Sequence, residues 1–263
     1  MNGRLHGKGP YRLVAVHGGP GAPGSASTLA RQLSAFSGTL EPFQSETTVM
    51  GQVEELAKQI TDQADHAVTL FGHSWGAWIA YLLAYSHPEL VKKVFLIGAG
   101  AFHPGYVAEM HRRRRFRLSS LESREYDRII ARLADDTATD HDVLLGRLGE
   151  LAAKADHYCV EPIPENREEI VRMDGAQYRS VWQEGASLRE SGFFVQIAAG
   201  IQCPLRVIQG REDPTPIEAV LEPLKALARD LKGYEIARCG HEPWKEQYAR
   251  EAFWHIVAEE LAS

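Results

Sequence analysis

The chain has 263 residues, of which 44% are hydrophobic and 24% charged, which is ordinary for a soluble globular enzyme and sufficient for one large core plus an insertion. Its formal net charge of −6 argues against a general nucleic-acid binder. No apolar stretch reaches the roughly 18 residues of a membrane span, so no contact with a membrane is expected.

The cysteines Cys159, Cys203 and Cys239 are odd in number, widely spaced and without a CxxC pair. This argues against a disulfide framework and against a cysteine zinc site, and it favours a reducing cytoplasm. The polar N-terminus lacks the apolar core of a signal peptide. We therefore expect a cytoplasmic protein that uses neither a metal nor a cofactor.

Strand and helix patterns alternate through the first hundred residues. Residues 1–10 contain glycines and a proline and are expected to form a loose lead-in. Short links between alternating strands and helices predict a parallel sheet with helices on both faces. The predicted elements are a strand over 11–16, a helix over 22–36, a short strand over 39–43, a helix face over 53–64, a strand over 67–71, a helix over 77–85 and a strand over 94–97.

The pattern changes over residues 101–199, where almost all apolar residues recur at helical spacing. We expect this block to be a helical cap (a lid) inserted into a core made of residues 1–100 and 200–263. The predicted elements of the second core segment are a strand over 204–208, a helix opened by a capping box at Thr215–Glu218, a last strand over 234–237 and a C-terminal helix with an apolar stripe from Trp244 to Val257.

The motif GHSWG, residues 72–76, lies between a strand pattern and a helix pattern. This is the context of a G-x-S-x-G nucleophile elbow, a strained turn that exposes a serine at the C-terminal edge of a sheet. A side chain at Gly72 or Gly76 is expected to collide with the neighbouring strand or helix. The sequence therefore predicts Ser74 as a nucleophile.

A serine nucleophile needs a base, and two later loops supply candidates in the order that this architecture uses. GRED, residues 210–213, follows one predicted strand, and CGH, residues 239–241, follows the last. Because the C-terminal ends of parallel strands meet at one edge, we assign His241 as general base and acid and Asp213 as the residue that orients it. Glu212 is the alternative acid.

HGGPG, residues 17–21, follows the first strong strand and is interpreted as part of an oxyanion hole. Two backbone N–H groups must point at the oxyanion of a tetrahedral intermediate. Trp75 is expected to supply one, and Gly18 or Gly19 the other, with Gly19 preferred. A phosphate-binding loop is the competing interpretation, but the lysine spacing and the G-x-G-x-x-G pattern are missing.

Together these four motifs resemble the α/β-hydrolase superfamily, over residues 11–100 and 201–261. HGGPG with a tryptophan after the nucleophile is similar to its proline iminopeptidase branch, which releases N-terminal proline from peptides. Because only about ten residues precede the first strong strand, the N-terminal strands of this fold are expected to be shortened or missing. The serine argues against the relatives that open haloalkanes or epoxides with an aspartate.

The proline iminopeptidase resemblance implies acidic cap residues that hold a free amine. Residues 180–184 resemble an acidic tryptophan motif of those caps, so Trp182 and Glu184, with Gly18, are candidate pocket residues. A solvated helix face is the alternative for any cap glutamate. The cap glutamates considered as amine ligands are Glu161, Glu165, Glu184 and Glu190.

The cap also contains a basic run, HRRRRFR, at residues 111–117. It could attract an anionic substrate or partner. We favour a solvated helix whose charges pair with Glu109, Glu122 and Glu125.

Three functions are compatible with these motifs. The first is a serine hydrolase that cleaves a small ester, amide or short peptide through an acyl-enzyme. The second is a proline iminopeptidase-type aminopeptidase. The third is a protein of this fold that binds a small ligand or a partner without turnover, which the complete set of nucleophile, base and acid disfavours.

Overall fold

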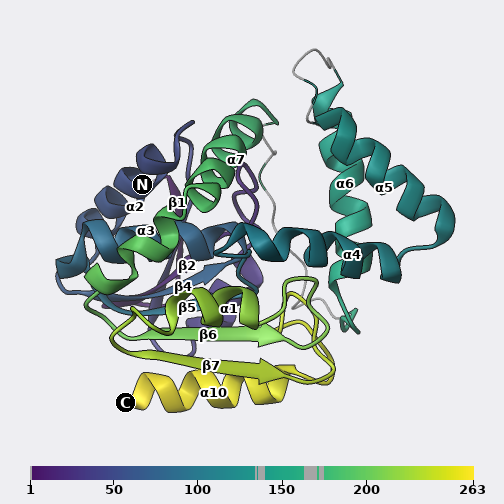
Figure 1. The fold of residues 1–263 in the computed structure, drawn as a ribbon. Helices are drawn as coiled ribbons and strands as arrows, with labels where there is room; N and C mark the ends of the chain where they lie inside the picture. Colours follow the sequence, from purple (N-terminus) through teal and green to yellow (C-terminus); the bar gives the residue numbers. More distant parts are fainter. Residues whose placement is uncertain (1, 134, 136–139, 163–170, 172–174) are drawn as a thin grey trace.

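The computed structural model describes residues 2–133, 135, 140–162, 171 and 175–263 (Figure 1). Its centre is a seven-stranded sheet in the order β1-β3-β2-β4-β5-β6-β7. Only β1 runs antiparallel to its neighbour, so the predicted, mostly parallel sheet is confirmed. The strands are β1 (Gly3–His6), β2 (Tyr11–Val16), β3 (Gly38–Pro42), β4 (Val68–His73), β5 (Val91–Ile97), β6 (Leu205–Gly210) and β7 (Leu231–Ile236).

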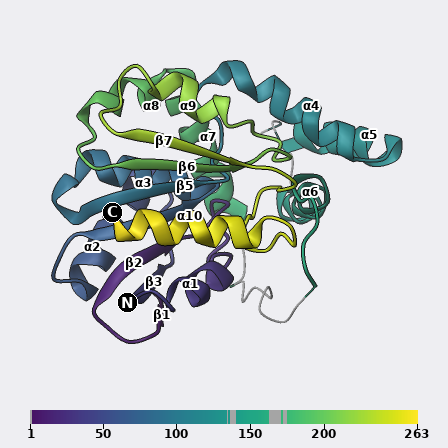
Figure 2. The same ribbon diagram turned by 90° about the horizontal axis from the view of Figure 1, so that it is seen from below.

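Helices cover both faces of the sheet, and each face has its own apolar cluster. Helices α1 and α10 pack on one face, which is turned toward the viewer in Figure 2. Helices α2, α3, α8 and α9 pack on the other. These helices are α1 (Ser27–Leu33), α2 (Val49–Gln63), α3 (Trp75–Ser86), α8 (Phe193–Gln196), α9 (Glu218–Leu224) and α10 (Arg250–Ala262), and short 3₁₀ helices lie at Pro88–Leu90, Pro104–Tyr106 and Ile197–Gly200.

Four longer helices lie between β5 and β6, where the sequence predicts the cap (Figure 1). Helix α4 runs beside the sheet edge, and α5 and α6 project away from it as a pair with a small apolar cluster around Tyr126 and Leu151. Among the helices of the described ranges, none is long and apolar enough to cross a membrane. The helices are α4 (Val107–Arg117), α5 (Ser120–Leu133), α6 (His141–Asp156) and α7 (Gly175–Glu190).

The N-terminal residues differ from the predicted loose lead-in. Residues Gly3–His6 form a strand that pairs antiparallel with β3, from Gly3 opposite Pro42 to His6 opposite Thr39. The open edge of β3 offers unpaired backbone groups, and a short polar segment can pair with them without an apolar pattern of its own. A strand of four residues is thus present before β2.

Two helix starts also differ from the prediction. The C-terminal helix begins at Arg250, so Trp244 and Tyr248 lie in the preceding loop and not on its apolar stripe. Helix α9 begins at Glu218 without a capping hydrogen bond from a side chain, so the capping box is wrong. The backbone N–H of Thr215 instead donates to Asp213 Oδ1 at 2.8 Å, which ties this segment to the acidic loop.

The elbow between β4 and α3 has the strained conformation that its motif predicts. Ser74 has φ 53° and ψ −113°, a region that residues with a side chain rarely adopt. A Cβ at Gly72 would lie 2.4 Å from the carbonyl oxygen of Gly76, and one at Gly76 would lie 2.4 Å from that of Val16. Both glycines are therefore required by close backbone contacts.

We expect Gly76→Ala to lower the free energy of unfolding by at least about 2 kcal/mol, because backbone would have to move to admit the methyl group. Gly146→Ala in α6 is the matched control, since nothing lies within 4 Å of its added Cβ. That change is expected to be neutral or to stabilise by up to about 1 kcal/mol through helix propensity. Urea unfolding of both variants measures the difference, and equal effects would contradict the assignment.

Candidate active site

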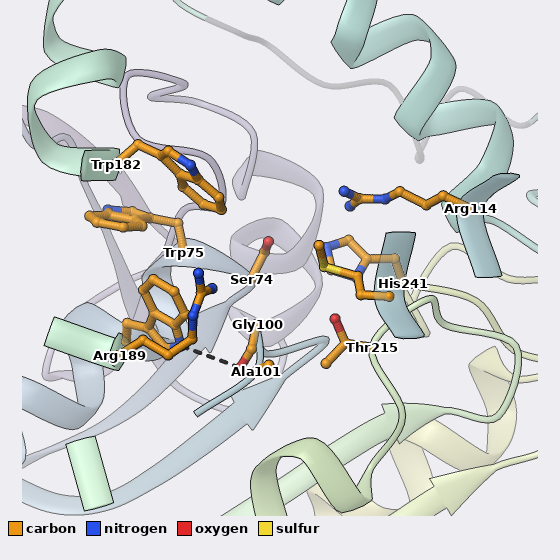
Figure 3. Close-up of a pocket in the computed structure, with 11 residues that line it drawn as sticks. Ser74, Trp75, Gly100, Ala101, Arg114, Trp182, Arg189, Thr215 and His241 are labelled. Atoms are coloured by element: carbon orange, nitrogen blue, oxygen red, sulfur yellow. Dashed lines mark hydrogen bonds between the residues drawn. The ribbon is translucent and has the colours of Figure 1, made fainter. Parts of the chain in front are cut away.

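Ser74 stands at the C-terminal end of β4, and the loops after β6 and β7 meet it at the same sheet edge. The backbone N–H of Ser74 donates to Ile97 at the end of β5 at 2.9 Å, which fixes the turn. Ser74 and His241 both line the cavities at this edge, and Figure 3 shows the serine hydroxyl facing the space between them.

The loop after β6 brings Asp213 to His241. Nδ1 of His241 lies 2.8 Å from Oδ2 of Asp213, and the carboxylate is almost completely buried. The other carboxylate oxygen accepts the N–H of Thr215, so both oxygens are held. Because the carboxylate oxygen accepts this hydrogen bond, His241 donates from Nδ1, and its Nε2 is left outside the pair.

Glu212, the alternative acid, has a different contact. Its Oε2 accepts the backbone N–H of Cys239 at 2.8 Å and so supports the loop that carries His241. The contacts therefore separate two adjacent carboxylates that the sequence left as alternatives. Asp213 meets the imidazole, and Glu212 holds the backbone two residues before it.

The environment of His241 favours its protonated form. Burial alone would lower the pKa of the imidazole, but the charge and hydrogen bond of Asp213 outweigh it and raise that pKa above the ordinary value. Asp156 adds to this shift and Arg114 opposes it. The His241 imidazole is thus more basic than an isolated histidine.

Two further histidines, His73 and His17, contact backbone groups of the site. Nε2 of His73 lies 3.3 Å from the backbone oxygen of His241, and its ring meets Trp244 edge-on at 4.8 Å. His17 contacts the Gly18 carbonyl through Nδ1 at 3.0 Å and accepts the N–H of Gln44 through Nε2. Burial lowers the pKa of both His17 and His73, so both act as neutral hydrogen-bonding groups.

Glu246 anchors the loop that carries His241. Its buried carboxylate accepts backbone N–H groups from Gly240, Tyr158 and Cys159. His157 lies 3.7 Å from the same carboxylate and 3.1 Å from Glu242. Although burial opposes its charge, these contacts raise the pKa of His157 to about 10, so it is a cation at neutral pH.

The basic run on α4 is solvated at Arg112, as we favoured from the sequence, but three of its arginines turn to the loops of the site. Arg113 donates to the backbone oxygen of Asp213, and Arg117 to that of Glu212. Arg114 forms a two-bond ion pair with Asp156, at 2.8 and 2.6 Å, and the backbone oxygen of Asp156 accepts the N–H of His241. The run therefore ties the cap to both loops of the site.

Only part of the expected surface pairing of this run is found. Glu109 does pair with Arg112 and Arg113. Glu122 pairs instead with Lys154, and Glu125 with Arg147. Sequence spacing identifies i,i+3 and i,i+4 pairs, but it does not show which arginines turn inward to backbone carbonyls.

The two glycines considered for the oxyanion hole have different surroundings. A Cβ at Gly18 would lie 2.8 Å from His73 Nδ1 and 3.3 Å from Ser74 Cβ, so this residue is packed against the elbow. Gly19 adopts a left-handed φ of 54° and lines the larger cavity with Pro20 and Trp75. This placement favours Gly19, and the two oxyanion donors stay a prediction.

Two cavities with shared lining residues open at Ser74. The smaller has a volume of about 60 Å³ and the larger about 620 Å³. Ile130, Leu133, Leu145 and Leu148 of α5 and α6 give the larger one an apolar end. The residues that line both are Ser74, Trp75, Met110, Arg114, Trp182, Arg189 and His241.

Of the two predicted pocket residues in the cap, Trp182 lies at the cavities and Glu184 does not. Trp182 lines both cavities, 6.2 Å from the rings of Trp75 and Trp78. The Glu184 carboxylate instead accepts the N–H of Val49 at the start of α2, at 2.7 Å, and does not line either cavity. The structure therefore joins Trp182 to the site and places Glu184 elsewhere.

Of the other candidate cap glutamates, the two that the structure describes do not line either cavity. Glu161 pairs with Arg250 at 2.7 Å, and Glu190 is exposed beside Arg189. Glu165 lies outside the described residues. Among the described residues that line the larger cavity, Asp156 is the only acidic one, and its charge is already paired with Arg114.

Sequence reasoning missed four charged residues of the cavities, namely Arg114, Asp156, Arg179 and Arg189. Arg114 was within a run interpreted as solvated. Asp156 and Arg189 come from the ends of α6 and α7, and no local motif marks them. Their position depends on how the cap helices pack, which is a tertiary property.

Comparison with known proteins identifies the architecture. Residues 13–252 match the alpha/beta hydrolase family. A search of curated proteins finds no match. Among solved structures, the chain is similar to VinJ (18% identity, TM-score 0.70, 99% of this chain and 94% of that one).

Two further similar structures are of enzymes with a named activity. An esterase from Exiguobacterium antarcticum shows 18% identity and a TM-score of 0.67, with 99% of this chain and 95% of that one covered. A proline iminopeptidase from Mycobacterium smegmatis shows 17% identity and a TM-score of 0.66, with 99% and 93% covered. At these identities the likeness concerns the fold alone.

Proposed function

The chain belongs to the alpha/beta hydrolase family, and from this premise we propose that it is a serine hydrolase that cleaves a small ester, amide or short peptide through an acyl-enzyme. The contact between His241 and Asp213, at the same sheet edge as Ser74, is the observation that carries the proposal. Such a set is needed to activate a hydroxyl and is superfluous for binding alone.

The proposed reaction has two halves. Ser74 Oγ attacks the substrate carbonyl carbon while His241 Nε2 accepts its proton, and the resulting oxyanion is held by the N–H groups of Gly19 and Trp75. The carbon–oxygen or carbon–nitrogen bond then breaks, and the leaving group receives the proton from His241. Water repeats the sequence on the acyl-enzyme, which releases the acid and restores Ser74.

A proline iminopeptidase-type aminopeptidase is the second candidate within this proposal. The HGGPG loop and Trp75 support it, as does the fold shared with the Mycobacterium smegmatis protein. The charges of the cavity favour a substrate that is an ester or amide without a free amine. Asp156, the one acidic residue among the described lining residues, is paired with Arg114. An amine would therefore meet no unpaired carboxylate among the described lining residues.

A fluorophosphonate probe followed by a substrate panel tests the proposal. The probe is expected to label the folded protein at one serine, identified by peptide mass spectrometry as Ser74. The panel compares acyl p-nitrophenyl esters of increasing length with proline p-nitroanilide and other aminoacyl anilides. Hydrolysis of esters favours the first candidate and hydrolysis of prolyl anilide the second. If the probe does not label and nothing is hydrolysed, the protein only binds its ligand.

The pH dependence of kcat/KM follows from the raised pKa of His241. The imidazole must be neutral to accept the serine proton, and a raised pKa keeps it protonated to a higher pH. We expect kcat/KM for an uncharged ester to rise with pH along a limb whose midpoint lies above 6.5, the ordinary value for histidine. A midpoint below 6.5 would contradict the assigned base.

A further inference from the structure

Arg189, near the C-terminal end of α7, is a buried cation with an unpartnered guanidinium nitrogen. Its side chain is 9% exposed, and its Nε has no hydrogen-bond partner among the described residues. The nearest carboxylate is that of Glu190, whose Oε1 lies 3.7 Å from an Nη of Arg189, beyond hydrogen-bond distance, and which is 59% exposed. Burial of such a group is costly unless a partner is supplied.

The guanidinium of Arg189 faces the site. It lies 5.6 Å from the ring centre of Trp78 and lines both cavities together with Ser74 and His241. Figure 3 shows it turned toward the space around the Ser74 hydroxyl, below Trp75 and Trp182. The planar guanidinium of Arg189 is thus held against the Trp78 ring, with its N–H donors toward the cavity.

Glu190, the ion-pair partner of Arg189, lines neither cavity, and no described residue that lines them is paired with Arg189. Arg114 faces the same space from α4, and its own charge is matched by the two-bond pair with Asp156. Arg179 adds a further cation to the lining of the larger cavity. Asp156 is the only carboxylate among the described lining residues, so the cavity carries an excess of positive charge beside the nucleophile.

We propose that Arg189 binds a carboxylate of the substrate, so that the enzyme hydrolyses esters or amides that carry a free carboxylate close to the scissile bond. This rests on the proposed serine hydrolase function. The carboxylate enters the small cavity and meets the guanidinium through two parallel hydrogen bonds, a geometry that suits arginine. The uncharged part of the substrate occupies the apolar end of the larger cavity, between α5 and α6.

The lining of the small cavity includes Arg114 and Arg189 and, among the described residues, no carboxylate. This positive charge favours an anionic group of the substrate and disfavours a substrate amine at this position.

Matched substrate pairs test the proposal in the wild-type protein. On the acyl side, mono-p-nitrophenyl glutarate is compared with p-nitrophenyl valerate. On the leaving-group side, 4-carboxyphenyl butyrate is compared with 4-carbamoylphenyl butyrate. After subtraction of the uncatalysed rate, we expect one carboxylate substrate to exceed its neutral partner in kcat/KM by roughly 10- to 100-fold, as charged hydrogen bonds provide. No preference in either pair would overturn the proposal.

Substitution of Arg189 links the preference to this residue. Arg189→Gln is expected to reduce the ratio of the two kcat/KM values to about one, and Arg189→Lys, which keeps the charge without the fork, to an intermediate value. Arg128→Gln, at an exposed position on α5, is the matched control and should leave the ratio unchanged. A preference that survives unchanged in Arg189→Gln would overturn the proposal.

A binding measurement separates this proposal from the hydrolase proposal on which it rests. Calorimetric titration of the Ser74→Ala protein with glutarate, and with uncharged glutaramide, does not depend on turnover. Glutarate is expected to bind more tightly, and Arg189→Gln in the same background to remove the difference. Binding without hydrolysis of any ester would retain the carboxylate site and reject the hydrolase. Hydrolysis with neither preference nor selective binding would do the reverse.

Discussion

Replacing Ser74 with alanine is expected to lower kcat by roughly 10⁵- to 10⁶-fold and to abolish fluorophosphonate labelling. The loss is large because the nucleophile, the base and the acid act as one unit. What remains is the contribution of substrate binding and of the oxyanion hole. The measurement is kcat for the best ester of the panel, with labelling followed by gel fluorescence.

Ser86→Ala is the matched control for this change. Ser86 lies in the last turn of α3, the helix that follows Ser74, and is exposed. Its hydroxyl donates only to the carbonyl of Leu82 in that helix. Its replacement should leave both turnover and labelling intact. Retained turnover in Ser74→Ala would mean that another group attacks the substrate, and the proposed mechanism would then be wrong.

Asp213→Asn is expected to lower kcat by about 10⁴-fold, because an amide in place of the carboxylate favours the wrong histidine tautomer and does not stabilise the imidazolium. Glu212→Gln is the adjacent control. The Gln side-chain oxygen can still accept the N–H of Cys239, so we expect a loss of less than about tenfold. Steady-state kinetics of both variants decide between the acids, and the opposite order would exchange the two roles.

The sequence predicts the elbow and its neighbours well because their signals are local. The strained turn requires glycine at positions 72 and 76, and the five-residue motif GHSWG identifies both positions. Residues 13–16 and 94–97, the inner parts of β2 and β5, are continuous apolar runs, as is typical of strands buried on both faces. The loops that carry Asp213 and His241 follow from the parallel sheet, since strand ends of one polarity share an edge.

The features that the sequence did not predict depend on long-range contacts. Strand β1 forms because β3, more than thirty residues later, offers an edge. Glu184 binds the N–H of Val49, 135 residues away, and no periodicity in either helix indicates that contact. Arg189 likewise becomes a buried residue of the cavities only through the packing of α7 against Trp78.

The arginines of α4 limit how a cap can be exchanged between members of this family. Arg113 and Arg117 hold the backbone on either side of the Asp213 side chain, and Arg114 reaches the His241 loop through Asp156. A foreign cap grafted between β5 and β6 would bring a new pocket but leave these carbonyls without their donors. A chimera that retains α4 and the end of α6, and replaces only the intervening hairpin, would change substrate range while the catalytic loops keep their support.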